Sequence, residues 1–242
     1  MKIGLLGYGR MGKAVEEEAK ARGHEIMYAI DMGMDKAYEE MLKSPPEVVI
    51  EFTHPDSFEG NFQKLMEAGI PMVAGTTGWY DQMEEIKAEV EKKEGSFMYA
   101  SNFSVGVNLM FKLNQMLAKF MNDYPEYDCF IEERHHKFKK DAPSGTAIAL
   151  GNQVLEKLDR KTKLAHEELV NRAPEEEELS VGFVRSAGIR GTHEVTYVSD
   201  IDSLTIRHEA YSRRGFALGA VIAAEWLAGK KGFYSFSDIF EG

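Results

Sequence analysis

A short segment in the middle of the chain concentrates the side chains that could do acid–base and anion-binding chemistry. It begins at His135 and reads HHKFKKDAPSGTA, so five of its first six side chains are histidine or lysine. Histidine donates protons near neutral pH, and lysine attracts carboxylates and phosphates. The turn that follows predicts a helix start, with Ser144 as its cap and with backbone N–H groups at Gly145 and Thr146 free to bind an anion. We therefore expect a cationic pocket with a proton donor beside it.

Plainer interpretations of this segment remain open. A run of lysines is often a solvated loop, and a capped helix needs no ligand. Adjacent histidines in a strand point to opposite faces, and no cysteine supports them, so we expect no metal site. His193 could line the pocket, although packing within a strand is favoured, and His54 could approach a cofactor or only shape a turn.

A glycine-rich loop near the N-terminus is the second candidate. GYGRMG places Gly7, Gly9 and Gly12 in G-x-G-x-x-G spacing after an apolar strand and before a helical pattern. Such glycines allow a tight turn, the approach of a pyrophosphate to the backbone, and close packing of helix on strand. Asp31 ends the next strand, where a carboxylate would bind the ribose hydroxyls of an adenosine. The loop predicts a dinucleotide site, and a glycine turn in another α/β fold is the alternative.

The residues around Asp31 bear on which dinucleotide binds. Its carboxylate would repel a 2′-phosphate, and the next residue is Met32 rather than an arginine that could hold this phosphate. Lys36 and Arg10 could offset part of the repulsion. We expect NADH to be preferred, with NADPH as the alternative.

Two later loops also follow apolar strands, in VAGTTGW and in ASNFS. Loops at the carboxyl ends of parallel strands line the ligand crevice of an open sheet, although both could be plain turns. The predicted cofactor-binding residues are therefore Gly7, Tyr8, Gly9, Arg10, Met11, Gly12, Asp31, Gly75, Thr76, Thr77, Ala100, Ser101, Asn102 and Phe103.

The elements that would position these loops change in kind along the chain. Up to Ser104, strand-like runs alternate with helical patterns, which predicts a parallel sheet with helical crossovers. Beyond it we expect an α+β module: a helix with Met110, Leu113, Leu117 and Met121 as core, a strand DCFIEERHH, the helix SGTAIALGNQVLEKL, and a hairpin around DID. The charge run PEEEELS is expected to be a solvated loop.

The composition excludes several classes of function. The formal net charge of −11 opposes general binding to nucleic acid or to an anionic membrane, because both need an extended basic surface. Cys129 is the single cysteine, so an intramolecular disulfide and a cysteine metal cluster are excluded. No apolar run approaches the ~20 residues that cross a bilayer. We expect a cytoplasmic protein without nucleic-acid or membrane partners.

Taken together, these motifs resemble the dihydrodipicolinate reductase family. The most specific element is ERHHKFKKDAPSGTA, which is similar to the family's signature of two histidines, a lysine and D-A-P-S-G-T-A. GYGRMG, VAGTTGW, ASNFSVGVN, GIRGTHEV and SRRGFALGAVIAAEWL occur in the family's order, so the resemblance spans nearly the whole chain.

The resemblance implies an NAD(P)H-dependent reduction of 4-hydroxy-tetrahydrodipicolinate in diaminopimelate and lysine biosynthesis. It implies that His135 protonates the substrate ring as general acid and that Lys139 holds or polarises the substrate. The substrate-binding residues would be His136, Lys139, Ser144, Gly145 and Thr146.

The resemblance also implies the domain organisation. Residues 1–104 and 214–242 would form a Rossmann-like dinucleotide-binding domain, because the C-terminal helix returns to the first domain. Residues 105–213 would form an α+β domain that binds substrate and builds a homotetramer.

The chain departs from the family pattern in three places outside the signature. The segment between Asp31 and Glu47 is short and GIRGTHEV lacks a longer insert, the glycine loop is one residue shorter than the commoner version around Arg10 and Met11, and Met32 replaces a frequent basic residue. Two other functions remain as alternatives: a Rossmann dehydrogenase of an amino or keto dicarboxylic acid, and a non-catalytic protein that senses NAD.

Overall fold

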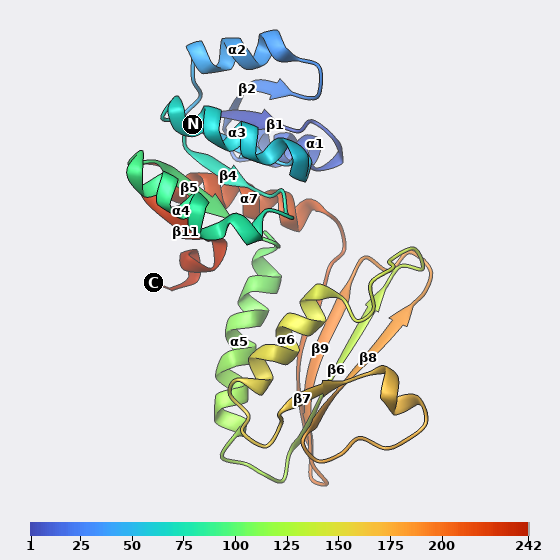
Figure 1. Ribbon diagram of the computed structural model, residues 1–242. Coiled ribbons are helices and arrows are strands. Elements are labelled where there is room, and N and C mark those ends of the chain that lie inside the picture. The colour runs from blue at the N-terminus through green and yellow to red at the C-terminus, as the bar shows by residue number, and fades with distance from the viewer. Residues whose placement is uncertain (242) are drawn as a thin grey trace. The chain divides into compact units, whose positions relative to one another are not determined.

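The computed structural model describes residues 1–241, and at residues 167 and 168 it describes the backbone alone. The chain divides into two compact units. Unit 1 contains Met1–Val105 together with the chain from Arg213 onward, and unit 2 contains Gly106–Ser212. Each unit has its own sheet and its own apolar core (Figure 1).

Unit 1 is built on a parallel sheet of six strands in the order β11-β5-β4-β3-β1-β2. The strands are β1 (Lys2–Leu6), β2 (Glu25–Ile30), β3 (Val48–Glu51), β4 (Met72–Ala74), β5 (Ser96–Tyr99) and β11 (Gly232–Ser235). Most are continuous apolar runs, as expected for strands that are covered on both faces.

Helices cover both faces of this sheet. One core joins the strands to α1 (Arg10–Ala21) and α7 (Arg214–Leu227), and a second joins them to α2 (Asp35–Lys43), α3 (Pro55–Glu67) and α4 (Met83–Lys92). Short 3₁₀ turns precede α4 (η1, Tyr80–Gln82) and follow β11 (η3, Phe236–Phe240). The short segment between Asp31 and Glu47 thus contains a regular helix, α2. The C-terminal helix α7 packs closely because a Cβ at Gly219 would lie only 1.7 Å from the carbonyl oxygen of Phe103.

Unit 2 is a mixed sheet of five strands in the order β10-β9-β6-β8-β7. Its strands are β6 (Asp128–His135), β7 (Lys163–Ala165), β8 (Glu178–Arg185), β9 (Thr192–Val198) and β10 (Ser203–Glu209), with β9 antiparallel to both of its neighbours. The core on one face of the sheet includes α5 (Val105–Met121) and α6 (Gly145–Leu155). A short 3₁₀ turn, η2 (Glu167–Val170), follows β7.

Two expectations for unit 2 were wrong. Leu113 is 52 % exposed, because the buried stripe of α5 runs through Met110, Asn114 and Ala118, and the Asn114 amide donates to the Leu150 carbonyl at 3.0 Å. The stripe steps by four residues rather than three after Met110, so a buried asparagine occupies the place assigned to leucine.

The end of PEEEELS is likewise not a solvated loop. Glu178 begins β8 and is only 3 % exposed. Its carboxylate pairs with Arg172 at 2.6 Å and with Lys163 at 3.3 Å, and the bond from Arg172 holds the pKa of Glu178 at about 2.

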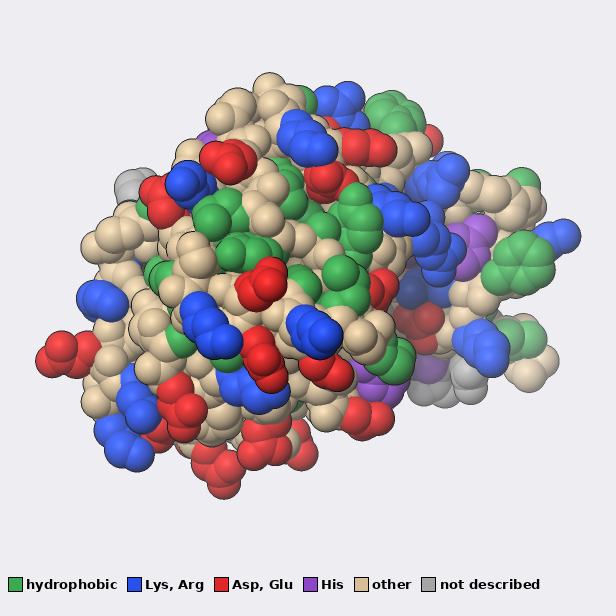
Figure 2. Space-filling view, turned by 90° about the horizontal axis from the view of Figure 1, so that it is seen from above, with side chains coloured by type: hydrophobic (Ala, Val, Ile, Leu, Met, Phe, Trp, Pro, Cys, Tyr) green, Lys and Arg blue, Asp and Glu red, His purple; other side chains and the backbone are tan. Residues whose placement is uncertain are grey.

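The molecular surface agrees with the acidic but mixed composition. Acidic and basic side chains are interspersed over the face seen in Figure 2, and apolar side chains lie exposed between them. Within the described part of the chain, none of the helices combines the length and apolar character needed to span a membrane.

Candidate functional site

The glycine loop of unit 1 follows β1 and leads into α1. Gly7 has φ of +86°, and a Cβ there would lie 2.0 Å from the carbonyl oxygen of Phe52, while a Cβ at Gly12 would lie 2.3 Å from the carbonyl oxygen of Gly7. Gly9 is different, because a Cβ there would meet nothing within 4 Å. Gly9 is also the N-cap of α1, and it offers no side chain that could bond the first-turn N–H groups. The loop therefore leaves these N–H groups to a ligand, which fits a dinucleotide pyrophosphate.

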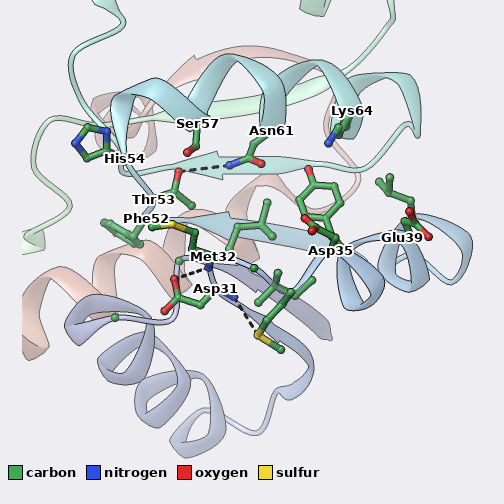
Figure 3. A pocket seen from close by; sticks show the side chains of 18 residues that line it. Asp31, Met32, Asp35, Glu39, Phe52, Thr53, His54, Ser57, Asn61 and Lys64 are labelled. Atoms are coloured by element: carbon green, nitrogen blue, oxygen red, sulfur yellow. Dashed lines mark hydrogen bonds between the residues drawn. The ribbon is translucent and has the colours of Figure 1, made fainter.

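A pocket of about 740 Å³ opens beside this loop (Figure 3). The lining residues that are labelled in Figure 3 lie just after β2 and β3 and on α2 and α3. Gly7, Gly9 and Asp31, which belong to the predicted cofactor-binding residues, line the pocket. The other predicted cofactor-binding residues lie outside this pocket.

The charges in the pocket are mostly negative. The lining contributes three carboxylates, from Asp31, Asp35 and Glu39, and one lysine ammonium, from Lys64. The Lys64 ammonium lies over the Tyr38 ring, 5.0 Å from its centroid. The Asp31 carboxylate accepts the N–H of the next residue, Met32, at 2.9 Å. Met32 is 97 % exposed, so its side chain is free to pack against a ligand.

The loop after β4 is tied to the loop after β3 by a buried carboxylate that the sequence reasoning missed. Glu51 is fully buried, and its Oε1 accepts the Thr76 hydroxyl at 2.8 Å, the Thr53 N–H at 3.0 Å and the Thr53 hydroxyl. Burial raises the pKa of Glu51, and the bonds from Thr53 and Thr76 offset only part of this effect. Thr76 is further held by the Trp79 indole, whose Nε1–H donates to its carbonyl at 2.8 Å. A lone glutamate inside the apolar run EVVIEF was the available signal.

The remaining predicted cofactor residues differ in exposure. Thr77 and Ser101 are exposed, whereas Ala100 and Phe103 are buried. The Phe103 ring packs against Phe236 at 5.1 Å between centroids, so Phe103 contributes its side chain to the core of unit 1.

In unit 2, the alternation of β6 sets the candidate acid–base site. Glu133 and His135 lie two residues apart on the face of the sheet that packs against α6, and β9 brings His193 alongside in register with Glu133. All three are buried, with Glu133 fully so. The Nε2 atoms of His135 and His193 are 3.3 Å apart, and they lie 3.4 and 3.5 Å from Oε2 of Glu133.

The other oxygen of Glu133 has charged and backbone partners. Arg185 of β8 donates to Oε1 at 2.5 Å, and the Ser144 N–H donates to it at 2.9 Å. Burial alone would raise the pKa of Glu133, but the polar groups around it, including His135, Ser144 and Arg185, outweigh burial and hold the pKa well below its usual range. These groups therefore favour the ionised form of Glu133.

The predicted substrate-binding residues surround this network. Ser144 is buried and caps α6, because its Oγ accepts the Ala147 N–H at 3.3 Å and lies 3.2 Å from Nε2 of His193. Gly145 and Thr146 form the first turn of α6, ahead of the first intrahelical bond, which runs from the Ile148 N–H to the Ser144 carbonyl. Ser144 thus serves the network, while the two residues after it present their N–H groups as a helix N-terminus does.

The lysines fall into two groups. The Lys139 ammonium pairs with Asp141 at 2.8 Å, which lowers the pKa of Asp141, and its backbone N–H donates to the His136 carbonyl. Lys137 and Lys140 are exposed, and the Lys137 ammonium lies over the Phe138 ring. Lys139 is the half-buried member of the run.

Glu133, His135 and His193 place three potential metal ligands within 4.8 Å of one another. Spacings of about 3.4 Å also occur between the ligands of a tetrahedral zinc ion. The guanidinium of Arg185 on the same carboxylate opposes a dication, however, and Nε2 cannot carry a proton and bind a metal at once. We interpret the cluster as a hydrogen-bonded network, and the expectation of no metal site stays a prediction.

Sequence reasoning thus missed Glu133 and Arg185, and it favoured packing over function for His193. The period of two in EERHH could have placed Glu133 on the same face as His135. No pattern in the sequence could have placed Arg185 or His193 beside them, because those contacts come from the pairing of separate strands.

Comparison with known proteins covers both units. Residues 1–103 match the family model described as dihydrodipicolinate reductase, N-terminus, and residues 106–240 match the one described as dihydrodipicolinate reductase, C-terminus. The chain is 42 % identical over 239 residues to the 4-hydroxy-tetrahydrodipicolinate reductase of Christiangramia forsetii, covering 99 % of this chain and 97 % of that protein. It is 35 % identical to the enzyme of the same name from Thermosipho africanus, covering 100 % of this chain and 98 % of that one.

A solved structure shares the fold. The dipicolinate-bound dihydrodipicolinate reductase from Paenisporosarcina sp. TG-14 superposes with a TM-score of 0.82 at 21 % identity, covering 99 % of both chains. At this identity the likeness concerns the fold alone.

Proposed function

The chain belongs to the dihydrodipicolinate reductase family, and we propose that it reduces 4-hydroxy-tetrahydrodipicolinate with NADH, His135 being the proton donor. The relatives that carry this name cover nearly the whole chain, and their reaction belongs to lysine and diaminopimelate biosynthesis. The observation that carries the residue assignment is the shared carboxylate of Glu133, which contacts His135 and accepts the N–H of Ser144, the N-cap residue of α6.

The geometry of unit 2 supports a division of labour among these residues. A substrate carboxylate at the N–H groups of Gly145 and Thr146 lies at the start of α6, where the helix dipole favours negative charge. Lys139 adds a positive charge from the same loop. His135 is joined to this helix start through Glu133, so a ring held there is within reach of its imidazole.

The cofactor, when bound, would supply a hydride to the substrate. The ring that accepts the hydride gains negative charge on a neighbouring atom, and His135 gives a proton to that atom. The glycine loop and the first turn of α1 bind the pyrophosphate of the cofactor, and Asp31 binds the hydroxyls of its adenosine ribose.

The charges around Asp31 support a preference for NADH over NADPH. A 2′-phosphate would lie beside Asp31 in a pocket that also holds Asp35 and Glu39, and only Lys64 in the lining of that pocket carries a fixed positive charge. Asp31→Ser should therefore lower kcat/KM for NADH and raise the NADPH to NADH ratio. Glu40→Gln removes an exposed carboxylate of α2 outside this lining, so it is the control and should leave the ratio nearly unchanged.

The test of the reaction is a coupled assay. Dihydrodipicolinate synthase makes the unstable substrate from pyruvate and aspartate semialdehyde, and the absorbance of NADH or NADPH is followed. We expect oxidation that depends on the complete mixture, a loss of ~10²–10⁴ in rate for His135→Ala, and a clear loss for Lys139→Ala. Lys137→Ala is the control and should retain activity. Normal turnover by His135→Ala would overturn the assignment, and no turnover by the wild type would leave the dicarboxylate dehydrogenase or the NAD sensor.

We further propose that the protein is a cytoplasmic homotetramer, as the family resemblance implies. One chain exposes large apolar side chains on α5, which is the kind of surface that assembly buries. They are Leu109, Leu113, Met116 and Phe120, each between 46 and 61 % exposed. Light scattering of the purified protein should give four times the chain mass of 27.3 kDa, and a monomer at micromolar concentration would refute the tetramer.

A further inference from the structure

The buried groups near Nε2 of His135 determine which of its two ring nitrogens keeps a hydrogen in the neutral ring. They are Glu133, His193, Ser144 and Arg185. Oε1 of Glu133 is occupied by Arg185 and by the Ser144 N–H. Oε2 is buried and has no hydrogen-bond partner of ordinary length among the described residues, but Nε2 of His135 and Nε2 of His193 both point at it from 3.4 and 3.5 Å. A buried anion needs a donor, so at least one of these nitrogens carries a hydrogen.

Ser144 decides between the two histidines. Its buried Oγ accepts the Ala147 N–H at 3.3 Å, and Nε2 of His193 at 3.2 Å is the acceptor that the described structure offers to its hydroxyl hydrogen. Nε2 of His193 is then an acceptor. This arrangement assigns the hydrogen that faces Oε2 of Glu133 to Nε2 of His135, and it places the hydrogen of neutral His193 on its buried Nδ1.

We propose that Glu133 and His193 are positioning residues that hold a hydrogen on Nε2 of His135, so that the proton given to the substrate is the one on Nδ1. The inference rests on the proposed role of His135 as the acid. In this step the Nδ1–H bond of the His135 imidazolium breaks and the hydrogen forms a bond to the substrate ring. His135 becomes a neutral imidazole whose remaining hydrogen is on Nε2.

Gly191 keeps the other edge of the ring open. It lies just before β9, and a Cβ there would be 2.9 Å from Cε1 and 3.3 Å from Nδ1 of His135. Any side chain at this position would press on the edge that carries the donated proton. The glycine and the network thus act on opposite edges of one imidazole.

Other charged groups face His135 from several elements. Arg185 of β8 neutralises part of the charge of Glu133, and His208 of β10 pairs in register with His193. Burial and the neighbouring His193 lower the pKa of His208, so His208 adds no positive charge near neutral pH. The loop before α6 contributes the Lys139–Asp141 pair, and α6 contributes the positive end of its dipole. Glu133 is the buried anion among them.

The first test is nitrogen NMR of the histidine rings in the wild-type protein, with the His135 signals assigned by comparison with His135→Gln. We expect neutral His135 to be the tautomer with hydrogen on Nε2. The Nδ1–H tautomer would overturn the proposal. This measurement needs neither substrate nor turnover.

The second test is Glu133→Gln, which keeps the shape of the side chain and removes its charge. The pH midpoint at which His135 loses its proton should fall by about 1–3 pH units, because an anion within ~4–6 Å favours the charged imidazole. Glu132→Gln is the matched control: Glu132 is the adjacent carboxylate on the opposite face of the sheet and pairs with Arg134. His193→Gln retains the charge of Glu133 and should not lower the midpoint. An unchanged midpoint in Glu133→Gln would refute the role of the carboxylate.

Kinetics then separate this proposal from the proposed function. The fall of kcat/KM on the alkaline side should move to lower pH in Glu133→Gln by the same amount as the NMR midpoint. A purely structural role would lower the rate by one factor at every pH. If the NMR midpoint moves and the kinetic profile does not, Glu133 positions His135 but His135 is not the acid, and the function assignment fails by itself.

Discussion

Replacing Glu51 with glutamine should stabilise the protein, and increasingly so as the pH rises. Glu51 is fully buried at the end of β3, and Oε1 of its carboxylate accepts the Thr53 N–H and the hydroxyls of Thr53 and Thr76. Oε2 is buried without a partner among the described residues. Burial therefore raises the pKa of Glu51 above that of an unfolded chain.

The sign follows from proton linkage. The folded state holds the proton of Glu51 at pH values where the unfolded chain, with an ordinary glutamate pKa of about 4.3, has lost it. The contribution to stability is therefore full below that value, decreases as pH rises toward the folded pKa, and stays low above it. Glutamine retains an oxygen for Thr53 and Thr76 but cannot ionise.

The magnitude follows from the unpartnered oxygen. A buried group without a hydrogen bond costs about 1–3 kcal/mol when neutral and more when charged, and glutamine places a neutral N–H group where the charged oxygen stood, so we expect a gain of about 1–3 kcal/mol. For a chain of this size that corresponds to a rise in Tm of roughly 2–12 °C at pH 8. Near pH 4.5 the protonated carboxyl and the amide are nearly equivalent, so the two proteins should melt together.

The assay is thermal unfolding of wild type and Glu51→Gln in parallel from pH 4.5 to pH 8.5, without cofactor. Glu59→Gln, an exposed glutamate on α3, is the control and should shift Tm by the same small amount at every pH. A difference between Glu51→Gln and wild type that is constant with pH, or that becomes more unfavourable as pH rises, would refute the reasoning.

Three further outcomes follow from the packing. Gly191→Ala should lower kcat/KM for the dicarboxylate substrate roughly 10–10²-fold with little change in the KM for NADH, because its Cβ displaces the His135 ring; steady-state kinetics with each substrate varied separates the two. Lys161→Met should reduce the free energy of unfolding by about 2–4 kcal/mol in a urea titration, because the buried ammonium bonds two backbone carbonyls. Trp79→Phe should cost about 1–3 kcal/mol in the same titration and raise the KM for NADH, since the Thr76 carbonyl loses its indole donor.

Much of the fold could be predicted because the spacing of apolar residues and the positions of turn residues indicate the same elements along the chain. The alternating strands and helices before Ser104 predicted the parallel sheet of unit 1, and the DID turn predicted the β9–β10 hairpin. The strand β8 was missed because its start lies in a run of glutamates. Glu178 enters a buried strand only because Arg172 and Lys163 neutralise it there. Such a partnership is set by the tertiary structure and leaves no mark on local hydrophobicity.

The features of the candidate sites likewise fall into those that local sequence predicts and those that only tertiary structure brings together. Local motifs predicted the glycine turn before α1, the place of Asp31 after β2 and the helix start at Ser144, because each conformation depends on neighbours in sequence. Glu133 and His193 meet only through the pairing of β6 with β9. A histidine in a strand does not reveal which groups the next strand will bring to it, so packing and function were not separable for His193.

The two buried glutamates show why residue type alone does not assign a role. Glu51 and Glu133 are both fully buried in strands of a sheet, yet burial prevails at Glu51, whose pKa is raised, and is overcome at Glu133, whose pKa is lowered. The difference lies in the donors. Glu51 receives hydroxyl and amide hydrogens from threonines, which carry no charge, whereas Glu133 faces the guanidinium of Arg185 and the imidazole of His135. Neutral donors hold a carboxyl in place to join two loops, whereas charged donors keep it ionised, and only an ionised carboxylate can set the protonation of His135.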